Sequence, residues 1–318
     1  MLDTEVSNLL TLMDEGFPRV HEMSPQEARA AVAARRAQVT NVDDVRSTED
    51  RTVPTEDGPL RVRVYWPHEP AKEAPPVVVF LHGGGFVFCD IESHDGFCRT
   101  MSRGTGSIVV SVDYRLAPEH KAPAAAEDAH AALRWAADNA RELGGDSDRI
   151  VVAGDSAGGN MAAVACLMAR DRVGPRVAAQ VMAYPVIDPS CDTDSYHQYA
   201  TGYFNTKAAM KWYWQQYLPA GPLPEPVDHV APLRAPSLTG LPPAVVITAG
   251  LDPLCSEGTA YAQALQRARV PTIHRHYPDL FHGFLTIAGF GAATAACELL
   301  WNDLYGLLTS NTVQGRTA

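Results

Sequence analysis

Short runs of consecutive apolar residues, separated by helix-like segments, are the feature that most constrains how this chain can fold. The runs VVVFL, IVVSV, IVVA, AQVMAY and AVVITA lie at residues 77–81, 108–112, 150–153, 179–184 and 244–249. Strands that are apolar throughout are typical of a parallel sheet whose two faces are both covered. Helical patterns lie between several of the runs, at residues 123–140, 161–171 and 258–268. This alternation predicts an α/β fold with helices on both sides of the sheet.

Further elements flank this alternation. The segment LRVRVYW (60–66) alternates apolar and polar residues, which is typical of a half-buried strand, and we expect another strand at TIHRHY (272–277). The first 45 residues or so look helical. Ser24, Pro25 and Glu27 form a capping box with proline at the first helical position. We therefore predict a helix that begins there and ends near Asn41.

The stretch from 188 to 241 breaks the strand–helix rhythm and is rich in proline and aromatic residues. It is too long for a simple connection, so we expect an insertion over the site. Ligands in such folds bind where the parallel strands end. The predicted division is N-terminal cap helices at 1–45, a first part of the core at 46–187, a cap insertion at 188–241, a second part of the core at 242–310 and a flexible tail at 311–318.

Composition narrows the possible classes of function. The 318 residues carry a formal net charge of −11, so nucleic acid and anionic membrane surfaces would repel the chain and are not expected partners. The six cysteines contain no CxxC pair, and we expect no zinc or other metal site. The N-terminus has no basic segment followed by an apolar run, and no apolar stretch has the length of a membrane span. We therefore expect a cytoplasmic location.

The motif GDSAG, at residues 154–158, lies between the apolar run IVVA and a helical stretch. This is the context of a nucleophile elbow, in which a tight turn between strand and helix lifts a serine hydroxyl out of the sheet. Gly154 and Gly158 allow the tight turn, and the start of the helix places free backbone N–H groups beside Ser156. We predict that Ser156 is a nucleophile. The competing interpretation is an ordinary glycine-rich turn.

The motif HGGGF, at residues 82–86, directly follows the apolar run VVVFL. A glycine run after a buried strand lets bare backbone N–H groups face a ligand, as in the oxyanion holes of lipases and esterases. The N–H group of Ala157 should supply a further donor. A phosphate-binding loop would have lysine and then serine or threonine after the glycines, where this chain has Phe86 and Val87. The motif therefore favours an oxyanion hole over a phosphate site or a flexible loop.

A serine nucleophile needs a general base, and enzymes with such an elbow carry their catalytic residues in the order serine, acid, histidine. The histidine that follows the last predicted strand is His282, in the loop PDLFHGF, and we choose it as the base. The other histidines after Ser156 lie in the insertion or alternate within a strand: His197, His229, His274 and His276.

The acid should directly follow a strand between Ser156 and His282. Asp252 closely follows the run AVVITA, and we prefer it to Asp228, which lies in a proline-rich loop, and to Asp279, which is close to His282 along the chain. The carboxylate of Asp252 would fix the tautomer of His282 and stabilise the imidazolium.

Together these motifs resemble those of the hormone-sensitive lipase family of α/β-hydrolases, in its bacterial branch. HGGGF, DYRLAPE (113–119), GDSAGGN (154–160), LDPL (251–254) and YPDLFHGF (277–284) occur in the family's order. The resemblance runs from about Val53 across nearly all the rest of the chain. It implies an eight-stranded, mostly parallel sheet flanked by helices, a helical cap, and hydrolysis of short acyl esters without a cofactor.

The resemblance also assigns the oxyanion hole. Gly84, Gly85 and Ala157 are the implied donors, and Gly83 shapes the turn. One departure concerns LDPLCSEG, because many relatives carry Arg and Asp where Cys255 and Ser256 stand here. The departure leaves the bracing around the acid open but does not affect the acid itself.

Aromatic residues near the glycine loop and in the insertion could wall an acyl pocket. The candidates are Phe86, Phe88, Tyr203, Phe204, Trp212 and Trp214. Packing within the cap is the alternative interpretation for those outside the glycine loop.

The combined prediction is a serine carboxylesterase that acts on small ester molecules through an acyl-enzyme. An amidase or a lactonase could use the same three residues, because contacts with the leaving group decide between these reactions. A small-molecule receptor on an inactive hydrolase scaffold is the alternative outside the enzymes, but such proteins typically lack a member of the triad. The natural ester and the oligomeric state are open, and a homo-oligomer is compatible with the sequence.

Overall fold

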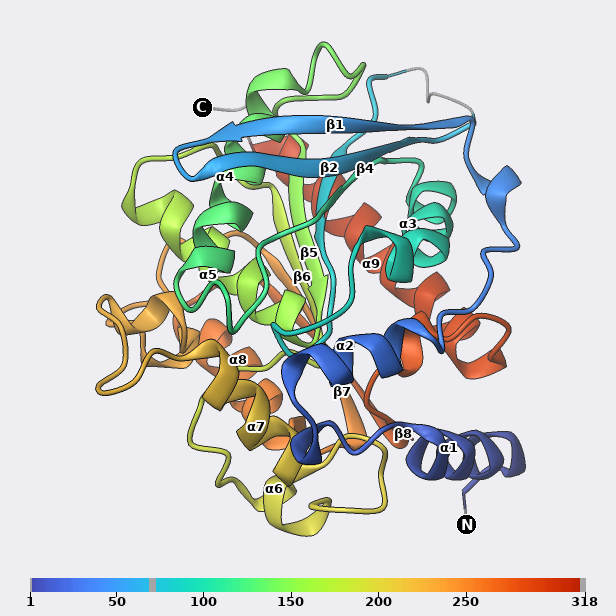
Figure 1. Cartoon of the computed structure of the whole chain (residues 1–318). Coiled ribbons are helices and arrows are strands. Elements are labelled where there is room, and N and C mark those ends of the chain that lie inside the picture. The colour runs from blue at the N-terminus through green and yellow to red at the C-terminus, as the bar shows by residue number, and fades with distance from the viewer. Residues whose placement is uncertain (1, 69–72, 315–318) are drawn as a thin grey trace.

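The apolar runs form the buried centre of one eight-stranded sheet in the computed structural model, which describes residues 2–68 and 73–314 (Figure 1). The strands are β1 (Ser47–Thr55), β2 (Gly58–Trp66), β3 (Val77–Leu81), β4 (Ile108–Val112), β5 (Ile150–Asp155), β6 (Ala179–Ala183), β7 (Ala244–Leu251) and β8 (Thr272–Phe281). Their order is β1-β2-β4-β3-β5-β6-β7-β8. The pairs β1–β2 and β2–β4 are antiparallel and the others are parallel, so the predicted mostly parallel sheet is confirmed.

The helices lie in two layers on the faces of the sheet and in a third group at one end of it. They are α1 (Thr4–Gly16), α2 (Pro25–Ala33), α3 (Ile91–Thr105), α4 (Ala124–Asn139), α5 (Ala157–Asp171), α6 (Asp194–Gln198), α7 (Lys207–Tyr217), α8 (Cys255–Arg267) and α9 (Gly291–Gln314). Short 3₁₀ helices lie at Val20–Glu22, Val42–Asp44, Val227–His229, Pro232–Arg234 and Phe284–Thr286. Among the described residues, no helix is both long and apolar enough to cross a bilayer.

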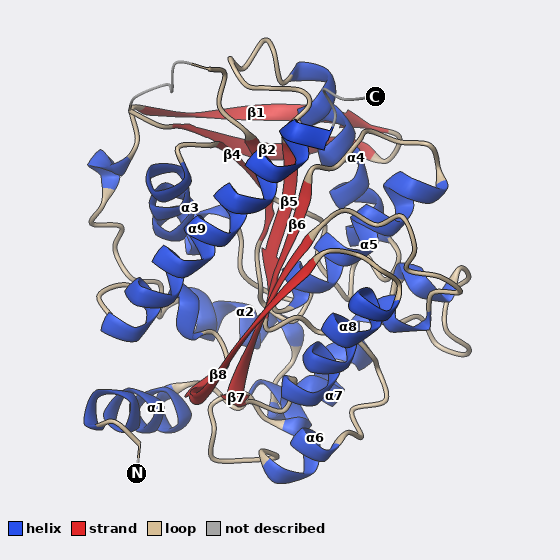
Figure 2. Cartoon of the chain, turned by 180° about the vertical axis from the view of Figure 1, so that it is seen from behind, coloured by secondary structure: helices blue, strands red, loops and turns tan. Residues whose placement is uncertain are grey.

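The alternation of side chains along each central strand builds two separate cores. In β3, Val77, Val79 and Leu81 pack into the core beneath α4, α5 and α8, whereas Val78 and Phe80 pack into the core beneath α3 and α9. Figure 2 shows α3 and α9 on one side of the sheet and α4, α5 and α8 on the other. Burial on both faces explains why these strands are largely apolar, with apolar residues at all five positions of β3.

The N-terminal segment and the 188–241 stretch meet at the end of the sheet where β7 and β8 finish (Figure 1). The predicted capping box is confirmed, since the Ser24 hydroxyl accepts the Glu27 N–H and the Glu27 carboxylate accepts the Ser24 N–H. The predicted end of this helix near Asn41 is wrong. The helix ends at Ala33, and the residues that follow it, 34–40, are largely exposed, so they bury little area that would stabilise a longer helix.

The two ends of the core also differ in detail from the sequence prediction. Strand β1 was not predicted, because STEDRTVPT buries only Val53 and therefore shows no apolar alternation. The last helix, α9, continues to Gln314 and so includes the first four residues of the predicted tail. The rest of that tail, residues 315–318, lies outside the described residues.

Candidate active site

Ser156 occupies the turn between β5 and α5, with φ 55° and ψ −116°. This left-handed conformation is strained for a residue with a side chain and persists only where the surroundings fix it. A Cβ atom on Gly158 would lie 1.9 Å from the Leu81 carbonyl oxygen, and one on Gly154 would lie 2.2 Å from the Gly158 oxygen. The Ser156 N–H donates to the Ala183 carbonyl at 2.8 Å. Glycine on both sides thus permits the tight turn that the GDSAG motif predicted.

The pairing of two neighbouring strands brings the predicted acid and base together. Strands β7 and β8 run in parallel with Leu251 opposite Phe281. The residue that directly follows β7 is Asp252, and the residue that directly follows β8 is His282. Two side chains that are 30 positions apart in the chain become neighbours at the carboxyl edge of the sheet.

A chain of hydrogen bonds joins the three predicted catalytic residues. His282 Nδ1 lies 2.7 Å from Asp252 Oδ2, and His282 Nε2 lies 2.9 Å from Ser156 Oγ. Because an ionised carboxylate can only accept, Nδ1 carries the hydrogen and Nε2 accepts from the serine hydroxyl. Asp252 is fully buried, and its other oxygen accepts the Leu254 N–H at 3.0 Å. This arrangement can take a proton from a serine that attacks a carbonyl carbon.

The other histidines after Ser156 do not join this chain. His274 Nε2 and His276 Nδ1 lie 2.9 and 3.0 Å from the Thr248 hydroxyl, so both bind one buried side chain of the neighbouring strand. His197 is exposed beside Asp192, and burial lowers the pKa of His229 in the insertion. Within residues 2–68 and 73–314, no three His, Cys, Asp or Glu side chains gather in a way that could hold a metal ion.

The glycine loop presents free backbone donors toward the same edge. The Gly84 carbonyl accepts the N–H groups of Val87 and Phe88 at 3.0 and 3.1 Å, and its φ of 116° is open only to glycine. In the described part of the chain, the N–H groups of Gly84, Gly85 and Ala157 make no hydrogen bond. The N–H of Gly83 donates to Asp155 Oδ1 at 2.8 Å. Gly83 is therefore not a free donor of the oxyanion hole, and its part is to hold the turn.

Buried polar residues behind the loop hold it in place. Asp155 accepts the Gly83 N–H and lies 3.3 Å from His94 Nε2. Burial would raise the pKa of Asp155, but the neighbouring His94 and His82 and the Gly83 N–H together lower it. Burial, and next the charge of His94, lower the pKa of His82 to about 4, so this ring is neutral where it stacks on Tyr114 at 4.2 Å. No motif in the sequence points to His94.

A chain of aromatic rings connects the glycine loop to the loop of His282. Tyr213 of α7 lies against Gly85, where a Cβ atom would meet its ring at 2.4 Å. The ring centroids of Tyr213 and Phe88 lie 5.6 Å apart, and those of Phe88 and Phe17 lie 6.3 Å apart. The centroids of Phe17 and Phe204 lie 5.0 Å apart. Phe204 in turn lies 6.4 Å from Phe281, beside Gly283. Of the predicted aromatic residues, the structure brings Phe88 and Phe204 into this chain.

Phe17 and Tyr213 were not predicted, because only the packing of α1 and α7 against the loops reveals them. The remaining predicted aromatics lie elsewhere. Phe86 stacks on Tyr217 at 4.0 Å behind the loop, with Trp214 at 5.4 Å from it. Trp212 packs edge-on against its neighbour Tyr213, and Tyr203 packs against Tyr199.

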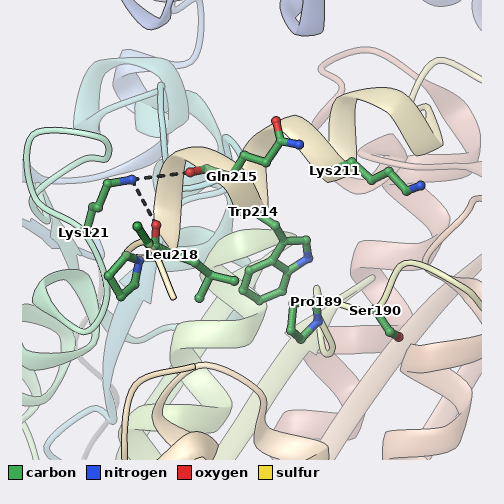
Figure 3. A pocket seen from close by; sticks show the side chains of 9 residues that line it. Lys121, Pro189, Ser190, Lys211, Trp214, Gln215 and Leu218 are labelled. Atoms are coloured by element: carbon green, nitrogen blue, oxygen red, sulfur yellow. Dashed lines mark hydrogen bonds between the residues drawn. The ribbon is translucent and has the colours of Figure 1, made fainter. Parts of the chain in front are cut away.

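Trp214 also lines a cavity of about 520 Å³, shown in Figure 3. Its walls include Lys121, Lys211 and Leu218, and its described lining contains no residue of the triad or of the glycine loop. The Lys121 ammonium donates to the Gln216 and Leu218 carbonyls at the end of α7, at 2.5 and 3.0 Å. Trp214 therefore contacts both this cavity and Phe86, and it is not a member of the chain of rings from Tyr213 to Phe281.

Comparisons with known proteins show which family and which solved structures the chain is similar to. A sequence family described by the alpha/beta hydrolase fold matches residues 78–286. Esterase LipI of Mycobacterium tuberculosis is 44% identical over 75% of this chain and 75% of its own length, and carboxylic ester hydrolase LipN of the same organism is 41% identical over 78% and 66%. A solved ester hydrolase from the metagenome of Lake Arreo, in complex with a bipyridine phosphonate derivative, is 38% identical, with a TM-score of 0.88 over 96% of this chain and 98% of that one.

Proposed function

We propose that this chain, which belongs to the hormone-sensitive lipase family of α/β-hydrolases, is a carboxylic ester hydrolase with Ser156 as its nucleophile. The observation that carries the proposal is the hydrogen-bond chain from Ser156 Oγ through His282 to Asp252, at 2.9 and 2.7 Å. The substrates we propose are small esters with short acyl chains, and the location we propose is the cytoplasm.

The reaction proceeds in two halves. In the first, Ser156 Oγ attacks the ester carbonyl carbon while His282 Nε2 takes the hydroxyl proton, and Asp252 stabilises the imidazolium. The N–H groups of Gly84, Gly85 and Ala157 donate hydrogen bonds to the developing oxyanion. The alcohol then leaves with the proton from His282, and the acyl group remains on the serine. In the second half, a water molecule gives a proton to His282 and attacks the acyl carbon. The bond to Ser156 Oγ then breaks, the serine regains the proton from His282, and the carboxylic acid leaves.

The short-chain preference rests on what covers the site. The N-terminal segment contributes Phe17 and the 188–241 stretch contributes Phe204 and Tyr213, and these rings lie between the glycine loop and Gly283. The Phe204 N–H donates to the Asp14 carboxylate of α1 at 2.8 Å, which joins the two segments. We propose that residues 1–45 and 188–241 form one cap and that its aromatic rings limit the length of the acyl chain.

Covalent labelling tests the nucleophile. A p-nitrophenyl phosphonate should modify the protein once and release one equivalent of p-nitrophenol, and peptide mass mapping should place the adduct on Ser156. Ser156→Ala should lose nearly all hydrolysis of p-nitrophenyl acetate and butyrate with an unchanged circular dichroism spectrum. Ser47→Ala, at an exposed position of the edge strand β1, is the matched control and should keep full activity.

An adduct on another serine, or an active Ser156→Ala variant, would contradict the assignment. Parallel assays with butyryl p-nitroanilide and with γ-butyrolactone measure amide and lactone hydrolysis at the same site. Greater kcat/KM on either than on the matched ester would replace the carboxylesterase by an amidase or a lactonase.

A further inference from the structure

We propose that Arg29 of α2 is a positioning residue for the oxyanion hole, because it ties the N-terminal segment to the loop that carries Gly84 and Gly85. The inference rests on the proposed function and adds a residue to it that lies outside the triad and the glycine loop. It concerns how the donors are held, since the guanidinium itself does not touch the reacting atoms.

The guanidinium of Arg29 binds three partners from two distant segments. Its Nε donates to the Val87 carbonyl at 2.7 Å and its Nη2 to the Ala117 carbonyl at 2.6 Å. Both terminal nitrogens also donate to the carboxylate of Glu119, at 2.8 and 2.5 Å. The first partner follows the glycine run, and the other two belong to the segment DYRLAPE.

These partners are the groups that shape the donor loop. The N–H of Val87 closes the turn on the Gly84 carbonyl at 3.0 Å, while its carbonyl is held by Arg29. The Ala117 N–H donates to the Phe86 carbonyl at 2.9 Å, while its own carbonyl is held by the same guanidinium. Arg29 therefore fixes the residues that directly follow Gly84 and Gly85 from two directions.

Beyond these bonds, α2 packs against the body of the protein through few apolar side chains, chiefly Ala28 and the partly buried Val32. The helix has nine residues and buries only Ala28, so the apolar area that holds it is small. The hydrogen bond with Arg29 lowers the pKa of Glu119 to about 2, so this carboxylate is ionised at neutral pH and accepts from the guanidinium. A lysine would keep the positive charge, but its ammonium lacks the planar fork of donors with which the guanidinium binds all three acceptors at once.

The variant Arg29→Ala should lower kcat for p-nitrophenyl butyrate by about ten- to a hundredfold, with KM changed less than about threefold. Displaced donors weaken binding of the oxyanion in the transition state more than binding of the ester. The inhibition constant of an alkyl trifluoromethyl ketone, whose serine adduct carries an oxyanion, should rise by a similar factor. Arg29→Lys should lie between the parent and the alanine variant.

The control is Arg172→Ala, which breaks another two-bonded arginine–glutamate pair. Arg172 binds Glu127 at 2.7 and 2.7 Å, and neither belongs to the site. Arg172→Ala should lower the melting temperature as Arg29→Ala does, but it should leave kcat and the inhibition constant of the trifluoromethyl ketone at parental values. Should Arg29→Ala not fold, Glu119→Gln takes its place with a smaller loss of kcat expected.

The outcomes separate the two proposals. A folded parent that hydrolyses no ester overturns the proposed function. An active parent whose Arg29→Ala and Arg29→Lys variants keep parental kcat and ketone binding overturns the role of Arg29 alone, and so does a change confined to KM. If only Glu119→Gln folds, parental kcat in that variant overturns it equally.

Discussion

Asp252 determines which nitrogen of His282 faces the serine, and it does so from a fully buried position. Asp252→Asn would present either an oxygen or an amide N–H to Nδ1 and so release the tautomer that the base needs. In the comparable protease case the loss in kcat is about 10⁴-fold, and we expect a loss of that order here. Steady-state kinetics on p-nitrophenyl butyrate measures it.

The matched control is Asp279→Asn, which neutralises an exposed carboxylate three residues before His282 and should keep parental kcat. The reverse result, in which Asp252→Asn keeps more than half of the activity and Asp279→Asn loses it, would transfer the acid role to Asp279.

Glu257 is a buried carboxyl group that no motif in the sequence predicts. It lies in the first turn of α8, and its Oε1 accepts the Ile187 N–H at 2.7 Å. Burial raises its pKa well above the ordinary range, with a smaller opposing effect from that hydrogen bond. The folded state therefore holds this proton more tightly than the unfolded chain does. Stability from this group is complete below the ordinary glutamate pKa and is lost as pH rises toward the raised value.

The variant Glu257→Gln removes the ionisation and keeps an oxygen for the Ile187 N–H. We expect the parent to lose stability relative to this variant between pH 5 and pH 8, as measured by urea unfolding at both values. Glu298→Gln, on the exposed side of α9, serves as control and should follow the parent. A parent that gains stability relative to Glu257→Gln over the same range would show that the carboxyl is ionised in the fold.

At the residue scale, the sequence predicted best those candidate catalytic residues that come directly after a strand. Ser156, Asp252 and His282 each follow a strand directly. Apolar runs marked the strands before Ser156 and Asp252, whereas the strand predicted before His282, at 272–277, stopped short of its observed end at Phe281. The aromatic candidates were harder, because a ring reaches the site only through the packing of distant segments. Phe17 and Tyr213 are adjacent to Phe88 in space but carry no local signal.

At the scale of elements, the nucleophile elbow depends on how closely α5 approaches β3. A methyl group on Gly158 would lie 1.9 Å from the Leu81 oxygen and 2.7 Å from the His82 oxygen, and neither backbone atom can give way cheaply. Gly158→Ala should push the helix outward, lower stability by about 1–3 kcal/mol or more, and remove most activity. Urea unfolding and the rate of phosphonate labelling measure the two effects.

The control for this substitution is Gly306→Ala in α9, where an added Cβ meets no atom within 4 Å among the described residues. Alanine there should leave activity unchanged and stabilise the helix by roughly 0.5–1 kcal/mol. If both alanine variants behave alike, the close approach of α5 to β3 does not constrain the elbow.

Element boundaries were predicted well where burial is two-sided and poorly where it is not. The central strands match their apolar runs closely, since every position of β3 and β4 is buried. Strand β1 escaped prediction because one of its residues is buried and most of the others are exposed. The start of α2 followed from its capping box, whereas its end depends on an absence of packing that the local sequence does not reveal.

At the scale of the whole molecule, the N-terminal segment and the 188–241 stretch contact each other at the end of the sheet. The Asp14–Phe204 hydrogen bond and the Phe17–Phe204 contact join them, and Arg29 ties the first of them to the glycine loop. The sequence indicated that both segments lie outside the α/β core. Their contact with each other joins residues about 190 positions apart, which no periodicity or local motif can express.

Removal of residues 1–40 tests this arrangement, because it takes away Phe17 and Arg29 while leaving the sheet and the elbow. Loss of the ring should open the aromatic chain between Phe88 and Phe204, so activity on p-nitrophenyl octanoate and decanoate should rise relative to acetate and butyrate. Loss of the guanidinium should lower kcat for every chain length. Full-length Arg29→Ala separates the effects, since it should lower kcat uniformly without changing the chain-length profile.

Phosphonate labelling of Ser156 should persist in the truncated protein. A truncated protein with the parental profile and parental kcat would show that the N-terminal segment neither covers the site nor positions its donors.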